Sequence, residues 1–170
     1  MKNYLIIFLS SLLFGFTAAL ADSGTRSVDT EANLSANPGE VMQAFLDEDD
    51  LKAWWKLSRT FVEPKVGGVW SISWDDWGED KTQHAWIGVI EELTPTSMVI
   101  GHLVMIEPDM PLLAPMQIQI IVSAADGGTA LALSHRGYGY GDHWDKMYEL
   151  VVNGWDHVLG DMEAWFQENY

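Results

Sequence analysis

The chain has 170 residues, of which 48% are hydrophobic, a formal net charge of −16 and no cysteine. Such an acidic surface repels phosphate backbones and anionic headgroups, which argues against nucleic-acid and membrane-surface roles. Without cysteine the chain has no disulfides and no lipoprotein anchor. The length suggests one domain, which a hydrophobic core alone must therefore stabilise.

Residues 1–21, "MKNYLIIFLSSLLFGFTAALA", are typical of a secretory signal peptide. Lys2 gives a positive start, Leu5 to Phe16 form an apolar run, and Ala19-Leu20-Ala21 is a small-x-small cleavage site. The run is short for a membrane span, and the alternative is an uncleaved anchor. We expect cleavage after Ala21, a periplasmic or secreted protein that does not contact the membrane afterwards, and one domain over residues 22–170.

After this segment, residues 25–37 alternate weakly between polar and apolar and predict an edge strand. The spacing of apolar residues then becomes helical. Asn37 is suited to cap a first short helix that has Pro38 at its first position. Asp49 or Asp50 is suited to cap a second short helix that carries Trp54. Two short helices are therefore expected after the first strand.

Six more strands are predicted by alternation, in residues 59–66, 69–74, 84–93, 98–106, 116–122 and 129–137. Gly67-Gly68 is a turn signal, 75–83 is a polar hairpin loop and 107–115 is a proline-rich connection. Because most of the connections are short, the seven strands are expected to form an antiparallel meander.

Residues 142–167 form one long amphipathic helix, since apolar residues recur at steps of three and four. Asp142 is the predicted N-cap. Gly154 interrupts the pattern at a cost of about 1 kcal/mol relative to alanine. We therefore expect a close approach to the helix at Gly154.

Five stretches of the sequence are similar, in order, to motifs of one known family: "VMQAFLDEDDLKAWW", "VEPKVGGVWSISW", "GVIEELTPTSMVIGH", "GGTALALSHRG" and "NGWDHVLGDMEAWF". On these the chain resembles the START-like superfamily, in the branch named after the activator of heat-shock-protein ATPase. The resemblance extends from about Val28 to Phe166. It implies an α+β helix-grip fold, in which a curved antiparallel sheet of about seven strands wraps a long C-terminal helix around a mostly apolar cavity.

Function does not follow from this resemblance, because the superfamily includes lipid carriers, hormone receptors, polyketide cyclases and cochaperone domains. Export argues against a cochaperone role, since the chaperone partner and ATP are expected to be absent outside the cytoplasm. Segments 75–83 and 107–115 are expected at the rim of the cavity.

If the concave face of the sheet lines a cavity, the residues facing it are predicted by alternation and by the helical stripe. They are Trp70, Ile72, Trp74, Trp86, Ile100, His102, Ile118, Ile120, Leu131, Leu133, His135, Met147, Val151 and Trp155. This composition suits an apolar or aromatic ligand with a few polar contacts. The alternative is that the tryptophan rings fill the space and form a solid core.

His102 and His135 share a predicted strand face with apolar residues, which leaves three roles open. A metal site is not expected, because the two histidines lack partners at metal-ligand spacing. Acid–base catalysis needs an orienting partner, and the spacing singles out none. A neutral imidazole hydrogen-bonded to backbone, tyrosine or ligand is the third role, and the preferred one.

We therefore expect an exported binding protein that holds a small hydrophobic or aromatic molecule between sheet and helix, without chemistry and without a cofactor. The alternatives are an enzyme of the cyclase or hydrolase kind that uses a cavity histidine, and an acidic module that docks a protein partner. The sequence identifies neither the ligand nor a protein partner.

Overall fold

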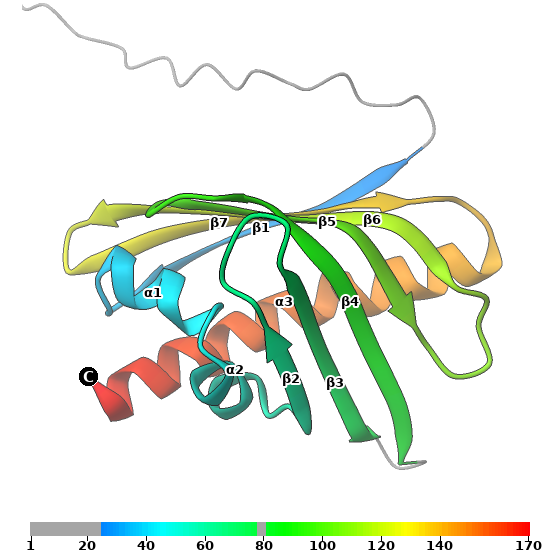
Figure 1. The fold of residues 1–170 in the computed structure, drawn as a ribbon, viewed down its shortest axis with the longest axis horizontal. Coiled ribbons are helices and arrows are strands. Elements are labelled where there is room, and N and C mark those ends of the chain that lie inside the picture. The colour runs from blue at the N-terminus through cyan, green and yellow to red at the C-terminus, as the bar shows by residue number, and fades with distance from the viewer. Residues whose placement is uncertain (1–24, 78–80) are drawn as a thin grey trace, which may run out of the picture.

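Seven antiparallel strands form one curved sheet in the computed structural model, which describes residues 25–77 and 81–170 (Figure 1). The strands are β1 (Arg26–Leu34), β2 (Arg59–Val62), β3 (Val69–Trp77), β4 (Thr82–Leu93), β5 (Ser97–Ile106), β6 (Leu113–Ala125) and β7 (Gly128–Tyr138). Their order across the sheet is β1-β7-β6-β5-β4-β3-β2, a meander to which β1 is added at the edge next to β7. The predicted signal peptide and its cleavage site lie outside the described residues.

Three helices complete the fold: α1 (Pro38–Ala44), α2 (Glu48–Trp55) and α3 (Asp142–Asn169). α3 runs under the curved sheet, with α1 and α2 near its C-terminal half (Figure 1). α3 buries one stripe of residues at helical spacing: Met147, Val151, Trp155, Leu159, Met162 and Phe166. The predicted α+β helix-grip fold, with two short helices after the first strand, is confirmed.

The helix caps follow the sequence only in part. Asn37 caps α1 as predicted, since its Oδ1 accepts from the backbone N–H of Gly39 and of Glu40, at 3.0 and 3.1 Å. The predicted cap of α2 is wrong: Asp47 caps it, and Asp49 and Asp50 are first-turn residues. The predicted cap of α3 is also wrong, because the N-cap is Gly141 and Asp142 is already helical.

Some strand bounds also differ from the prediction. β3 continues to Trp77 and β4 starts at Thr82, so both strands extend into the segment 75–83, predicted as a loop. β6 starts at Leu113, inside the predicted connection 107–115, while β2 ends at Val62, before 66. The register of the sheet therefore extends to Trp77, which pairs with Thr82, and to Leu113, which pairs with Met105.

The inward position predicted for His102 is wrong. The pairing of β5 with β6 shifts between Ile100 and Leu103, and His102 has a φ of 49° in this bulge. The extra residue breaks the two-residue alternation, so that Ile100 and Leu103 are buried while the His102 side chain is 77% exposed. There the Nε2 of His102 lies 3.4 Å from Glu91 Oε1.

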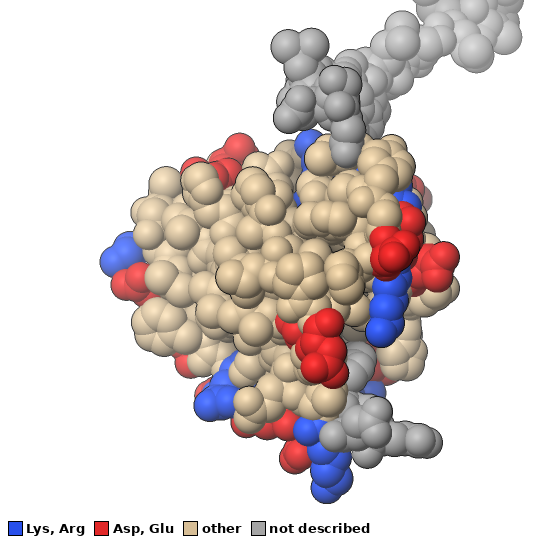
Figure 2. Space-filling view, turned by 90° about the vertical axis from the view of Figure 1, so that its right-hand side faces the viewer, with Lys and Arg blue, Asp and Glu red and all other residues tan. Residues whose placement is uncertain are grey.

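The charge of the protein is unevenly distributed. On the face shown in Figure 2, which is the right-hand side of Figure 1, a broad central area carries few charged side chains, and most of these lie toward its edges. In the described part of the chain, no helix has the length and apolar character that crossing a bilayer requires.

Candidate functional site

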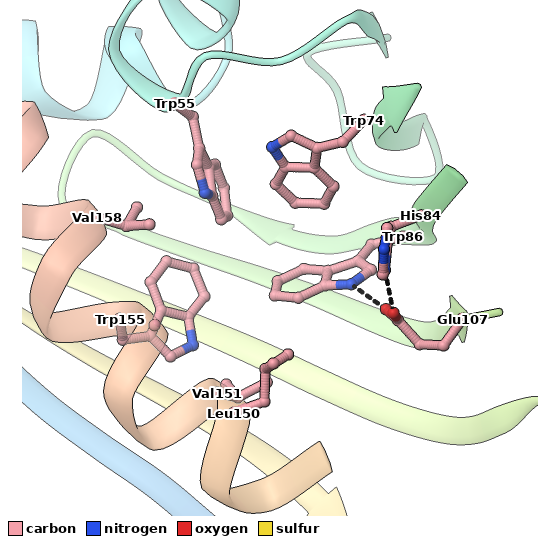
Figure 3. Close-up of a pocket in the computed structure, with 10 residues that line it drawn as sticks. Trp55, Trp74, His84, Trp86, Glu107, Leu150, Val151, Trp155 and Val158 are labelled. Atoms are coloured by element: carbon pink, nitrogen blue, oxygen red, sulfur yellow. Dashed lines mark hydrogen bonds and ion pairs between the residues drawn. The ribbon is translucent and has the colours of Figure 1, made fainter. Parts of the chain in front are cut away.

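A tryptophan-lined pocket lies between α3, α2 and the strands β3 to β5 (Figure 3). Four indole rings form its walls, from α2, β3, β4 and α3, and aliphatic residues of α3 close one side. The lining residues are Trp55, Trp74, His84, Trp86, Glu107, Leu150, Val151, Gly154, Trp155 and Val158. Among these described lining residues, only His84 and Glu107 are ionisable.

Trp55 connects the other three indoles of the pocket. Its ring centroid lies 5.8 Å from that of Trp74, 5.8 Å from that of Trp86 and 5.1 Å from that of Trp155. The first two contacts are edge-on and the third is tilted, geometries that aromatic pairs prefer. The wall is therefore held together by mutual aromatic contacts, with each of its rings at least 93% buried.

The polar end of the pocket is built around the carboxylate of Glu107, directly after β5. Its Oε1 accepts from the indole N–H of Trp86 over 3.3 Å, and its Oε2 contacts Nδ1 of His84 (Figure 3). The other ring nitrogen of His84 lies 2.8 Å from the hydroxyl oxygen of Thr82. Only 4% of the Glu107 side chain is exposed, so an indole N–H and an imidazole offset the cost of burying a carboxylate.

The cavity volume of about 80 Å³ limits what the pocket takes. An apolar protein cavity of about 150 Å³ holds benzene, so this pocket in its present form holds about three to four non-hydrogen atoms. The tryptophan rings therefore fill part of the predicted cavity but leave a hollow among them.

One side of the pocket opens beside α3. Leu150 lines the pocket and is 49% exposed, which places it at the mouth. Gly154, one turn later, also lines it, and a Cβ built there meets no atom within 4 Å. The close approach predicted at Gly154 is therefore wrong, because the glycine faces open space.

His135 is buried behind the wall of the pocket rather than in its lining. Its Nδ1 lies 2.9 Å from the hydroxyl of Tyr138 and accepts from the indole N–H of Trp155 over 3.4 Å. Because an indole N–H only donates, the neutral ring carries its hydrogen on Nε2, which has no partner among the described residues. Burial lowers the pKa of His135 to about 3, so the imidazole is uncharged at neutral pH.

The predicted site residues therefore divide into three groups. Trp74, Trp86, Val151 and Trp155 line the pocket. His135 lies behind it and His102 lies on the surface. The remaining eight pack into the hydrophobic core and do not line the pocket: Trp70, Ile72, Ile100, Ile118, Ile120, Leu131, Leu133 and Met147.

Six lining residues are absent from the predicted set of cavity-facing residues: Trp55, His84, Glu107, Leu150, Gly154 and Val158. His84 precedes Trp86 by two residues, so alternation within β4 places both on one face. Gly154 and Val158 continue the helical step from Val151. Glu107, directly after β5, lies in the segment 107–115 that is expected at the rim of the cavity, but no periodicity singles out this residue within it.

A second, shallower hollow has a larger volume of about 370 Å³ and lies beside α2. Its lining is largely polar and acidic: Gln43, Leu46, Asp47, Glu48, Asp49, Val62 and Pro64. Asp47 already caps α2. Among the described residues, no three histidine or acidic side chains gather to hold a metal ion.

Comparison with protein families gives one match, and it covers most of the described chain. The sequence model of the family "Activator of Hsp90 ATPase homolog 1-like protein" matches residues 35–167. None of the curated proteins compared with the chain matches it.

Solved structures share this fold at low sequence identity. The AHSA1 protein from Silicibacter pomeroyi is 18% identical, with a TM-score of 0.67 over 85% of this chain and 100% of its own. A protein from Chromobacterium violaceum is 20% identical, with a TM-score of 0.65 over 82% of this chain and 96% of its own. CalU16 from Micromonospora echinospora is 18% identical, with a TM-score of 0.59 over 84% of this chain and 76% of its own.

Proposed function

The chain belongs to the family of Activator of Hsp90 ATPase homolog 1-like proteins. We propose that it binds a small molecule, one end of which is a compact group with apolar carbon atoms on its outside that is held in the tryptophan-lined pocket. Proteins of this START-like fold typically bind hydrophobic ligands. No covalent chemistry on the ligand is part of the proposal.

The observation that carries the proposal is the hollow among four buried indole rings (Figure 3). An interior without a ligand role packs to crystal-like density and leaves few voids larger than a water molecule. Here Gly154 leaves space where any larger side chain of α3 would enter the hollow. Aromatic walls and an opening to the surface are both typical of ligand-binding pockets.

The size of the pocket defines the form of the ligand. Because about 80 Å³ takes only a few atoms, the bound group is the end of a molecule whose remainder passes out beside Leu150. Burial of each CH₂ unit contributes about 0.8 kcal/mol, so three or four buried carbons support weak, millimolar-range binding before other contacts are added.

The test compares two glycines of α3 that both meet open space, Gly154 in the pocket and Gly160 outside it. The probe is neohexyl alcohol, whose tert-butyl end matches the pocket in size, and the readout is tryptophan fluorescence. We expect saturable binding to the unmodified protein and to Gly160→Leu, and none to Gly154→Leu, whose side chain fills the hollow. Equal binding by both variants, or no saturable binding at all, would refute the proposal.

Export to the periplasm or exterior is part of the same proposal. It is supported by the positive start, apolar run and small-x-small site in residues 1–21. Amino-terminal sequencing of the protein from its native cell is expected to begin at Asp22, in the fraction outside the cytoplasm. A chain that retains Met1 and stays in the cytoplasm would contradict export.

Acid–base catalysis is a second candidate function, and the contact between His84 and Glu107 is the observation that favours it. A carboxylate that orients an imidazole beside a pocket is a common arrangement in general-base catalysis. It differs from the predicted arrangement, since neither His102 nor His135 lines the pocket. Turnover of an ester probe that is abolished by His84→Gln, with binding retained, would favour this candidate over simple binding.

A further inference from the structure

We propose that the group bound in the pocket is a small organic cation, such as an alkylammonium or a quaternary ammonium head. This inference rests on the proposed function, because it assigns a charge to the ligand of the same pocket. It follows from three features of the described residues: the aromatic walls, the single carboxylate at the polar end and the lack of a lysine or arginine there.

The walls favour a cation because indole faces carry negative electrostatic potential. Tryptophan is the strongest aromatic partner for a cation, and a desolvated contact contributes about 2 kcal/mol. Four indoles line this pocket, and a group of three or four atoms within it touches several of them. A neutral alkyl group gains the same burial but lacks this electrostatic contribution.

Glu107 supplies the charge complement. Glu107 is one of the lining residues, and its carboxylate is fixed from two sides by the indole N–H of Trp86 and the ring of His84. Among the described lining residues there is no lysine or arginine to neutralise it. An anionic ligand would meet the carboxylate of Glu107 with only the imidazole of His84 beside it, so the pocket discriminates against carboxylates and phosphates.

The net negative charge of the whole protein also favours a cationic ligand. The chain has 25 acidic and 9 basic side chains, and a field of this sign raises the local concentration of cations around the protein. A head of a few atoms with a tail at the mouth also fits the cavity volume of about 80 Å³ and the exposed Leu150. A trimethylammonium head, with one nitrogen and its methyl groups, has this size.

The test uses two molecules of one shape. Choline and neohexyl alcohol differ in the atom at the centre of the head, nitrogen with a positive charge or neutral carbon. Titrations followed by tryptophan fluorescence, at fixed chloride concentration, give the ratio of their affinities. We expect choline to bind about tenfold more tightly, the ratio that a difference of about 1.4 kcal/mol produces.

Two variants measure the part of the affinity ratio that is due to Glu107. Glu107→Gln keeps the size of the side chain and removes its charge, and we expect the affinity ratio to fall, with the smaller preference due to the indole rings remaining. Glu92→Gln removes the same charge from an exposed position on β4, and we expect the ratio to stay near its original value.

The outcomes separate this inference from the proposed function. Saturable binding of both compounds with equal affinity overturns the cation assignment and leaves the proposed function standing. Absence of saturable binding for both compounds overturns the two together. A ratio that falls equally in Glu92→Gln and Glu107→Gln also overturns the assignment, because overall charge rather than the pocket would then explain it.

Discussion

The indole N–H of Trp155 donates to Nδ1 of His135 over 3.4 Å, which links the pocket wall on α3 to β7 behind it. His135 lies on the same inward face as Leu131 and Leu133, so a titratable ring occupies a position of the core. The His135 ring is tolerated in the core because it is uncharged, and because it also packs against Trp86 at a centroid distance of 5.4 Å. His135 therefore supports the wall and does not meet the ligand.

The first prediction concerns pH. The pKa of His135 is lowered from 6.5 to about 3 in the folded protein, so the unfolded chain binds a proton at a higher pH than the folded one. The stability that the neutral His135 ring gives the folded protein is fully present above pH 6.5 and is lost as the pH falls toward 3. Between about pH 7.5 and 5 it costs the folded protein about 2 kcal/mol.

Urea unfolding at both pH values measures this effect, with His135→Gln as the reference. We expect the free energy of unfolding to fall by about 2 kcal/mol more in the unmodified protein than in the variant, which lacks the titrating ring. Equal losses in the two proteins would contradict a buried neutral imidazole. A general loss from carboxylates cancels in the comparison.

Neighbouring tryptophans are expected to differ in role. Trp54 and Trp55 stack at a centroid distance of 4.9 Å, but only Trp55 lines the pocket. The indole N–H of Trp54 donates to the backbone oxygen of Ala44 over 2.8 Å, inside the core. Trp54→Phe leaves that oxygen without its partner and is expected to cost about 1–3 kcal/mol of stability with ligand affinity unchanged.

Trp55→Phe is the matched comparison, since it shortens a ring of the pocket wall. We expect its affinity for the probe to fall several-fold. Urea midpoints and fluorescence titrations on the two variants measure both effects. A loss of affinity in Trp54→Phe that equals the loss in Trp55→Phe would show that the fold, and not the pocket wall, controls binding.

The glycines of α3 give a prediction about stability. Gly154 and Gly160 both have open space where alanine would place its methyl group, and alanine is favoured over glycine inside a helix by about 1 kcal/mol. Each glycine-to-alanine variant is therefore expected to be more stable by about that amount in thermal unfolding. If Gly154→Ala were instead destabilising, a close approach at that position would have to exist.

His102 provides a surface reference. Its side chain is 77% exposed in the bulge of β5 and lies on the outside of the sheet, near Glu91. We expect His102→Gln to change stability by less than about 0.5 kcal/mol and to leave probe affinity unchanged. Reduced probe binding by this variant would place His102 in the pocket and contradict the bulge.

The overall fold was predictable because local signals agree with one another along the chain. Asn37 and Pro38 start α1 where the capping pattern places them, and Gly67-Gly68 gives the turn before β3. A Cβ on Gly68 would lie 2.1 Å from the backbone oxygen of Glu63, which explains why that turn requires glycine. The similarity to a known family supplied the way in which the sheet grips the long helix.

The site was predictable only where strands and helix are regular. Alternation predicts that Trp74 and Trp86 face the cavity, and the helical step predicts the same of Val151 and Trp155; all four line the pocket. It failed at His102, because a bulge adds one residue to β5 and reverses the faces that follow.

The distance between helix and sheet, which varies along the fold, is the second reason why predicted cavity residues do not line the pocket. Inward residues on β5, β6 and β7 are buried in the hydrophobic core, whereas the pocket forms toward β3 and β4, where α2 also contributes a ring. Periodicity indicates which face is inward but not how far helix and sheet are apart. Glu107 comes from a connection, where no period applies.

The central claim is that the hollow among the four indoles of the pocket holds a ligand, and the indole N–H signals in a ¹H–¹⁵N spectrum test it most directly. During a titration with neohexyl alcohol, the probe of the proposed function, we predict that the signals of Trp55, Trp86 and Trp155 shift together and saturate, while that of Trp54 in the core stays in place. Saturable shifts confined to tryptophans outside the pocket, or no saturable shift in any indole signal, would contradict the account.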